Sequence, residues 1–137
     1  MTLVPAEAPR TCPHCPRLVA YRAANARAEP TWFNGPAPSF GDANARLLVV
    51  GLAPGRRGAN RTGRPFTGDY AGDLLYETLG KFGFAKGVYR ADPDDGVALK
   101  GAMITNAVRC APPENKPTPE EIKTCRPFLM ARMAALP

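Results

Sequence analysis

The sequence predicts a layered α/β domain, because a strand, a loop and a helix follow one another twice along its 137 residues. Apolar residues make up 45% of the chain, which is enough to form a hydrophobic core and excludes a disordered tail. No apolar run approaches the length of about 18 residues that a membrane helix needs. The first residues also lack the charged and apolar segments of a secretory signal, so we expect a cytoplasmic protein.

The charge of the chain indicates an anionic partner. Lys and Arg number 18 against 12 Asp and Glu, which gives a formal net charge of +6. The 16 prolines and 13 glycines indicate long, shaped loops around a modest amount of regular structure. We expect a monomer that binds its partner without involving a membrane.

The first half of the chain contains one predicted helix and one predicted strand. Residues 17–28 are expected to form a short helix within a segment rich in Pro, Ala and Arg. Residues 46–51 read RLLVVG, and such an apolar run between Arg and Gly is typical of a strand buried on both faces of a parallel sheet. A glycine-rich loop, residues 51–68, follows this strand.

The second half of the chain repeats this order. Mostly apolar residues recur at helical spacing, at positions 71, 74, 75, 78, 79 and 82, which predicts an amphipathic helix. Residues 84–97 indicate a surface loop, which contains a turn at residues 92–96. Residues 103–108, with the sequence MITNAV, predict a second buried strand.

The last predicted element is a helix that begins near Thr118. Residues 118–121 read TPEE, which is a capping box with proline at the first helical position. Pro127 is expected to kink or break this helix just after Cys125. Two strands alone cannot bury both faces of a parallel sheet, so we expect a single domain over residues 1–137 that is truncated at its C-terminus.

Four cysteines indicate a metal centre. Cys12 and Cys15 form a C-x2-C pair, and Cys110 and Cys125 are separated by 14 residues. Disulfides are rare in the cytoplasm, which argues against disulfide bonds here. A C-x2-C pair can turn both thiolates toward one metal site, and each distant thiolate then closes a loop of the chain. Zinc and a cubane iron–sulfur cluster use the same four ligands, and four buried free thiols are the third interpretation. His14 is expected to be a solvated loop residue beside this centre.

The loop over residues 51–69 carries the residue types of an anion-binding site. Loops at the carboxyl ends of parallel strands hold ligands in α/β folds, and glycines let the backbone approach a ligand closely. The loop has no acid before Asp69 and no G-x-x-x-x-G-K-[ST] run, which excludes a mononucleotide P-loop. A solvent-exposed basic loop is the plainer alternative. Four arginines could neutralise phosphates here, namely Arg56, Arg57, Arg61 and Arg64.

Three separated features resemble the iron–sulfur branch of the uracil-DNA glycosylase superfamily. Residues 51–55 (GLAPG) and 60–69 (NRTGRPFTGD) resemble motif 1 of these enzymes, and residues 104–113 (ITNAVRCAPP) resemble their next block. The spacing of the four cysteines matches as well. Family 4 enzymes carry an acid after the first glycine of motif 1, whereas this chain has Leu52, so it resembles family 5, the type b enzymes.

The resemblance implies a three-layer α/β/α fold with a central parallel sheet. It also implies hydrolysis of the N-glycosidic bond of uracil, or of other deaminated bases, in DNA. The four cysteines would then hold a 4Fe-4S cluster, with zinc as the alternative. The family uses a further histidine in a later motif, and the only histidine of this chain is His14. The alternative function is a non-catalytic zinc or iron–sulfur module that binds nucleic acid.

The resemblance also gives each site residue an expected role. Phe66 would stack on a flipped base, and the amide of Asn106 would match the Watson–Crick edge of uracil, with help from the backbone at Leu52 and Ala53. Bond cleavage builds positive charge on the sugar, which Asp69 would stabilise unless it acts only as a helix N-cap. Catalytic roles thus fall to Asp69 and Asn106. DNA contacts fall to Arg56, Arg57, Arg61 and Arg64.

Overall fold

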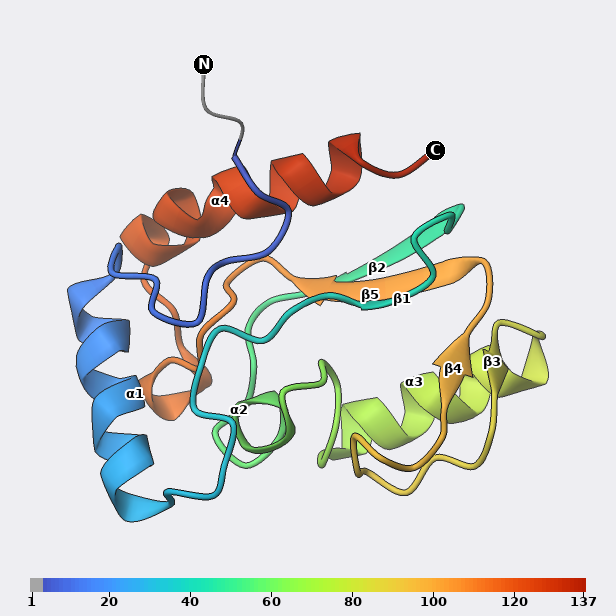
Figure 1. The fold of residues 1–137 in the computed structure, drawn as a ribbon, viewed down its shortest axis with the longest axis horizontal. Coiled ribbons are helices and arrows are strands. Elements are labelled where there is room, and N and C mark those ends of the chain that lie inside the picture. The colour runs from blue at the N-terminus through green and yellow to red at the C-terminus, as the bar shows by residue number, and fades with distance from the viewer. Residues whose placement is uncertain (1–3) are drawn as a thin grey trace.

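Helices lie on both sides of a small central sheet in the computed structural model, which describes residues 4–137 (Figure 1). α4 (Pro119–Ala134) runs along one side of the sheet, and α3 (Tyr70–Lys81) lies on the other side. α1 (Pro16–Ala28) and the short α2 (Ala59–Thr62) lie beyond the carboxyl ends of the strands. This arrangement confirms the predicted α/β class.

The centre of the sheet is a parallel pair of strands, β2 (Leu47–Gly51) and β5 (Ala102–Asn106). The register pairs Gly51 with Asn106, so both strands end at the same edge of the sheet, as the sequence predicted. β1 (Phe40–Gly41) pairs antiparallel with the other side of β5, which gives the order β1-β5-β2. The sheet of the described residues is therefore mixed rather than wholly parallel.

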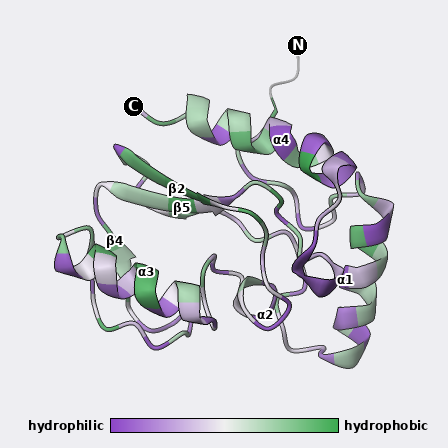
Figure 2. Ribbon diagram, turned by 180° about the vertical axis from the view of Figure 1, so that it is seen from behind, coloured by the Kyte–Doolittle hydropathy of each residue, from purple (hydrophilic) through white to green (hydrophobic). Residues whose placement is uncertain are grey.

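The two central strands differ in burial. All five residues of β5 are buried, as predicted, because β5 lies between two strands and under α3. β2 is the edge strand of the described sheet, and Leu47 and Val50 are 39% and 45% exposed. The prediction that this strand is buried on both faces is therefore wrong. Figure 2 shows that β2 is nonetheless strongly hydrophobic.

Two apolar clusters hold the helices to the sheet. Tyr76 and Leu79 of α3 pack on Ala102 and Ile104 of β5. The second cluster joins α1 to α4 beyond the end of β5, through Leu18, Val108, Cys125 and Phe128. None of the helices in residues 4–137 combines the length and the apolar character that a membrane span requires.

The predicted helix starts agree with the structure, but one predicted break does not. The Thr118 side chain accepts a hydrogen bond from the Glu121 N–H, and the Glu121 side chain accepts one from the Thr118 N–H, so the capping box is confirmed. α4 continues through Pro127 to Ala134, and the prediction of a break there is wrong. Proline removes one backbone hydrogen bond, and the buried side chains of Cys125 and Phe128 on either side of it keep the helix packed.

Four short elements form where the sequence predicted no helix or strand: α2, two strands and a 3-10 turn. α2 interrupts the loop over residues 51–68. β3 (Ala85–Lys86) and β4 (Ala98–Leu99) pair antiparallel beside α3, and a 3-10 turn covers Pro113–Asn115. All of these elements have four residues or fewer, which is too short for a periodic pattern to reveal.

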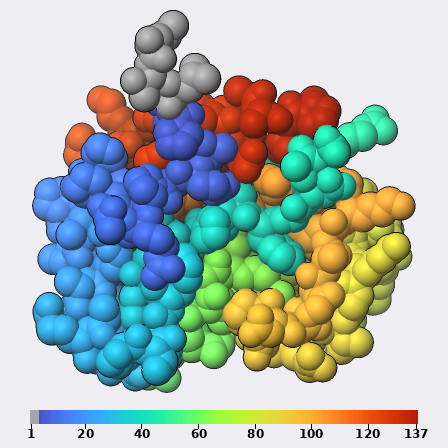
Figure 3. Space-filling view, in the orientation of Figure 1, coloured from blue at the N-terminus to red at the C-terminus, as the bar shows by residue number. Residues whose placement is uncertain are grey.

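The N-terminal segment packs across the front of the molecule, between α4 and the chain that leads into β1 (Figure 3). Glu7 anchors this segment: its carboxylate accepts hydrogen bonds from the Ser39 N–H at 2.8 Å and from Arg109 Nη1 at 2.7 Å. Arg132 of α4 contacts the same carboxylate at 3.3 Å. The segment is therefore tied both to α4 and to the residues after β5.

Candidate functional site

A cleft of about 200 Å³ lies at the carboxyl ends of β2 and β5. The two strands deliver residues that are far apart in the sequence to this edge, as expected where parallel strands end together. The cleft is lined by all five residues with an expected catalytic or base-binding role, namely Leu52, Ala53, Phe66, Asp69 and Asn106.

Phe66 and Asn106 converge on Gly51. A Cβ atom placed on Gly51 would lie 2.5 Å from Phe66 Cζ and 2.5 Å from Asn106 Oδ1. Real Cβ atoms do not approach other atoms so closely, so only glycine leaves room for both side chains here. An aromatic ring and an amide therefore lie side by side in the cleft.

Asn106 offers a buried amide with unused hydrogen-bonding capacity. The residue is only 3% exposed, and its backbone carbonyl accepts a hydrogen bond from Arg109 Nε at 3.0 Å. Its side-chain amide makes no hydrogen bond to any residue of the described chain. The amide lines the cleft, where its donor and its acceptor are available to a ligand.

The backbone at Phe66 adopts a conformation that most residues avoid. Its φ angle is +58°, in the left-handed region, which costs a non-glycine residue about 1 kcal/mol or more. Its carbonyl oxygen lies so close to Gly72 in the first turn of α3 that a Cβ there would overlap it. The ring lines the cleft and at the same time packs against the apolar cluster between α3 and β5.

Asp69 lies at the mouth of the cleft and also caps α3. Its Oδ1 accepts a hydrogen bond from the Gly72 N–H at 2.7 Å, which confirms the N-cap interpretation. The residue is exposed, and its Oδ2 has no hydrogen-bond partner among residues 4–137. One carboxylate oxygen thus fixes the side chain, while the other faces solvent at the cleft.

Three of the four loop arginines lie near the surface beside the cleft. Arg56 and Arg57 line an adjoining groove of about 510 Å³ that also includes Asp69. Arg57 is exposed, and Arg61 Nε donates to the Arg57 carbonyl at 2.9 Å. Arg56 is held by Asn25 Oδ1 at 2.8 Å and lies 5.0 Å from the centre of the Trp32 ring.

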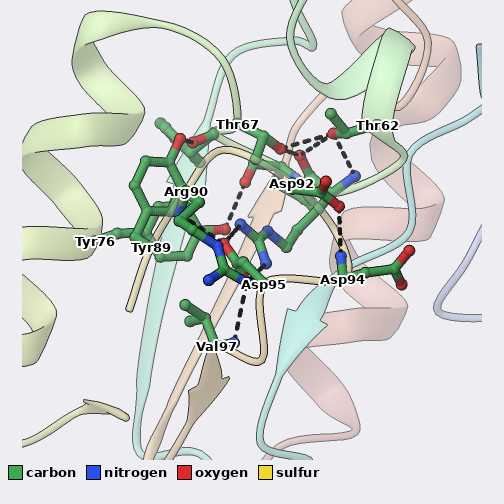
Figure 4. A network of polar contacts seen from close by, with 12 residues as sticks. Thr62, Thr67, Tyr76, Tyr89, Arg90, Asp92, Asp94, Asp95 and Val97 are labelled. Atoms are coloured by element: carbon green, nitrogen blue, oxygen red, sulfur yellow. Dashed lines mark hydrogen bonds and ion pairs between the residues drawn. The ribbon is translucent and has the colours of Figure 1, made fainter. Parts of the chain in front are cut away.

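The expectation that Arg64 contacts DNA is wrong. Arg64 is only 4% exposed, and its two Nη atoms donate to the two carboxylate oxygens of Asp95, both at 2.8 Å (Figure 4). The hydrogen bonds from Arg64 lower the pKa of Asp95. The acid that pairs with this arginine lies in a different loop, 31 residues away, so no pattern around Arg64 indicated the pair.

The four cysteines line one small cavity, which we call the cysteine cavity. Cys12 and Cys15 reach it from the N-terminal segment, Cys110 from the chain after β5, and Cys125 from α4. All four are free thiols, and burial raises the pKa of Cys110 to about 12. His14 is exposed at the edge of the cavity.

The donor set of the cysteine cavity consists of thiols, which are ligands of both zinc and iron–sulfur clusters. Four thiols face a space that is otherwise lined mainly by apolar side chains, among them Leu18, Val108 and Phe128. Yet no three His, Cys, Asp or Glu side chains within residues 4–137 are grouped closely enough to hold one metal ion. A zinc ion bonds to sulfur at about 2.3 Å and would draw its ligands closer together.

Sequence reasoning missed the residue that lies between the cleft and the cysteine cavity. Arg109 is fully buried, its Nε donates to the Asn106 carbonyl, and its backbone N–H lies 3.4 Å from Cys125 Sγ. Its partner Glu7 is 102 residues away along the chain, so no local pattern announced the pair. Sequence reasoning missed three residues around the loop that precedes α3 for the same reason, namely Tyr76, Tyr89 and Asp95.

Comparisons with known proteins identify a family for the chain. The family model described as the uracil DNA glycosylase superfamily matches residues 38–137. Proteins named type-5 uracil-DNA glycosylase are similar to most of the chain: that of Thermus thermophilus is 48% identical over 132 residues, and that of Pyrobaculum aerophilum is 44% identical over 129 residues. The matches cover 92% and 91% of this chain, but 59% and 57% of those proteins.

The matches also distinguish between two related families. A protein of Pyrobaculum aerophilum named type-4 uracil-DNA glycosylase is 35% identical over 100 residues, covering 72% of this chain and 43% of that protein. The higher identity to the type-5 proteins agrees with the resemblance drawn from Leu52. The chain spans a little over half the length of the type-5 relatives described above. Because the matching family model covers most of the chain, the protein belongs to the uracil-DNA glycosylase superfamily.

Proposed function

We propose that the protein excises uracil from DNA by hydrolysing the bond between the base and its sugar. The observation that carries this proposal is the amide of Asn106, which lines the cleft beside the ring of Phe66. A flipped pyrimidine needs a surface for stacking and a polar partner for its edge, and these two side chains offer both. The names of the similar proteins support the same activity.

Asn106 would recognise the base through its two amide atoms. An amide has one acceptor oxygen and one donor nitrogen, and the edge of uracil presents an N–H beside carbonyl groups. Backbone N–H groups near Leu52 and Ala53 would serve a second carbonyl. Since Phe66 stacks on any pyrimidine face, uracil specificity would come from the amide and the backbone.

Asp69 would act on the sugar instead of the base. Positive charge develops on the sugar as the bond breaks, and a carboxylate at the mouth of the cleft would stabilise that charge or orient the attacking water. Its Oδ1 is already held by the Gly72 N–H, so the position of the free Oδ2 is fixed in advance. Such preorganisation avoids the cost of moving the charge into place during the reaction.

Arg56, Arg57 and Arg61 would hold the DNA backbone. They lie in or beside the groove that adjoins the cleft, and the net charge of +6 favours a polyanion. Phosphate contacts position the duplex without reading its sequence. We propose that the protein works as a monomer in the cytoplasm.

We further propose that the cysteine cavity holds a 4Fe-4S cluster in a structural role. Four thiols around one mainly apolar space support a metal–thiolate centre, and the resemblance to the iron–sulfur branch of the superfamily favours a cluster over zinc. Cys12, Cys15, Cys110 and Cys125 would bind it and tie the N-terminal segment to α4. Its four bonds to thiolates would hold these segments of the chain together, as a covalent cross-link would.

Release of uracil from a uracil-containing duplex tests the proposed function. We expect single-turnover release by the protein and none from the same duplex with thymine. The Asn106→Ala variant is the matched control, because it leaves Phe66 and the arginines in place. DNA binding without release of any deaminated base would instead support a non-catalytic nucleic-acid-binding module.

A further inference from the structure

The loop that presents Phe66 is held from behind by a group of side chains with no assigned role, which we call the support group: Arg64, Tyr76, Tyr89 and Asp95. The four residues come from three separate parts of the chain, namely the loop before α3, α3 itself and the segment between β3 and β4. Figure 4 shows Asp95 beside Tyr76 and Tyr89.

The centre of the support group is a fully buried ion pair. The Asp95 carboxylate accepts two hydrogen bonds from Arg64 at 2.8 Å, and one each from the backbone N–H groups of Arg90 and Val97 at 3.0 Å. The Arg64 guanidinium lies 5.0 Å and 5.6 Å from the ring centres of Tyr76 and Tyr89. A buried pair with this many hydrogen bonds fixes its surroundings in one arrangement.

The two tyrosines connect this ion pair to the backbone on both sides of Phe66. Their rings stack at 4.5 Å with an angle of 12° between the ring planes. The Tyr76 hydroxyl donates to the Pro65 carbonyl at 2.8 Å. The Tyr89 hydroxyl accepts from the Gly68 N–H at 3.2 Å and donates to the Phe66 carbonyl at 3.5 Å. Residues 65, 66 and 68 are therefore each tied to this stack.

We propose that the support group positions the Phe66 ring against Gly51 and Asn106, so that Tyr76, Tyr89, Arg64 and Asp95 are positioning residues for the base-binding cleft. The left-handed backbone at Phe66 makes such support necessary, because a strained conformation persists only where its surroundings enforce it. The base-binding part of this inference rests on the proposed function. The positioning of the ring does not.

The test uses the full chain with Tyr89→Phe, which removes one hydroxyl and keeps the stacked ring. The readouts are the proton NMR resonances of Gly51 Hα and of the Gly68 N–H. Gly51 lies against the Phe66 ring, so its resonance reports the position of that ring. Tyr70→Phe is the control, because Tyr70 is 80% exposed and belongs to no part of the cleft. The dissociation constant for free uracil is measured on the same samples.

We expect both resonances to shift in Tyr89→Phe and not in Tyr70→Phe, with uracil binding weakened about fivefold, as the loss of one hydrogen bond implies. Unchanged Gly51 resonances would overturn the proposal, and so would shifted resonances with undiminished uracil binding. Tyr76→Phe repeats the test if Tyr89→Phe does not fold. A parental chain that binds no uracil would count against the proposed function, and the Gly51 resonance alone would then decide on the positioning.

Discussion

At the scale of single residues, the site depends on a few close approaches in which one residue leaves space for another. Gly51 leaves room for Phe66 and Asn106, and Gly72 leaves room for the Phe66 carbonyl. The motif at residues 51–69 therefore encodes a shape as well as a set of reactive groups. Substitutions at the polar residues of the cleft separate recognition from bond cleavage.

Asn106→Asp is expected to abolish detectable release of uracil in single-turnover assays, a loss of at least about a hundredfold. A carboxylate cannot donate to a uracil carbonyl, and it would repel the negative charge that develops on the departing base. The volume of the side chain hardly changes, so the thermal midpoint of unfolding serves as the control. Release at the parental rate would show that Asn106 does not contact the base.

Asp69→Asn is expected to slow bond cleavage while DNA binding and stability remain close to parental. Asparagine caps a helix about as well as aspartate, so the hydrogen bond from Gly72 has a replacement. The substitution removes only the charge that would stabilise the sugar. Single-turnover rates and DNA binding are measured in parallel, and equal losses in both would indicate a structural role instead.

At the scale of elements, sequence patterns predicted those parts of the fold that depend on local chemistry. The capping box at Thr118, the existence of α3 and the buried character of β5 are all local properties, and the structure confirms them. The predicted apolar stripe of α3 does not match its buried side: the helix buries Gly72, Tyr76 and Leu79, whereas Leu74 is 53% exposed. The predictions that β2 is buried on both faces and that Arg64 contacts DNA are both wrong. The exposure of β2 and the burial of Arg64 depend on partners far away in the sequence. The convergence of Phe66 and Asn106 was predictable only because parallel strands end at one edge.

Thr118→Ala is expected to lower the free energy of unfolding by about 1 kcal/mol, the usual value of an N-cap hydrogen bond. The N-cap of α4 also orients Glu121, which accepts hydrogen bonds from Arg17 Nε and Nη2 of α1 at 2.8 and 2.6 Å. Urea denaturation measures the change, with Thr118→Ser as the conservative control. A loss of equal size in Thr118→Ser would show that the methyl group of Thr118 matters more than its hydroxyl.

The basic loop should contribute to DNA binding through its charge. Replacing Arg56, Arg57 and Arg61 together with alanine is expected to weaken DNA binding and to reduce the salt slope by about 1 for each phosphate that is no longer neutralised. Binding is measured over a range of salt concentrations. Arg64 is left unchanged, because its burial against Asp95 would confound the result. A parental slope in the triple variant would show that these arginines do not bind phosphates.

At the scale of the whole molecule, buried ion pairs link segments that are distant in the sequence. Arg64 and Asp95 join the motif loop to the β3–β4 segment, and Arg109 joins Glu7 to the residues after β5. Breaking a buried pair leaves an uncompensated charge, which is strongly destabilising. The stability of the protein should therefore depend on the protonation of Asp95.

The dependence of stability on pH follows from Asp95. Hydrogen bonds from Arg64 hold the pKa of Asp95 below its ordinary value, so its stabilising contribution is complete above about pH 4 and decreases as the pH falls. The thermal midpoint, followed from pH 7 to pH 3, is expected to decrease most steeply below about pH 4. Asp95→Asn should be less stable at neutral pH and should show a weaker decrease with acid. Parallel curves for both proteins would assign the acid sensitivity to other carboxylates.

The contact between Glu7 and Arg132 also determines the order in which the chain can complete its structure. These residues are 125 positions apart. Chains are synthesised at about 5–20 residues per second, so Arg132 is made about 6–25 s after Glu7. During that interval Cys12 and Cys15 lack the partners that complete their cavity. The two thiols nearest the N-terminus thus spend the longest time in the newly made chain without the rest of their cavity.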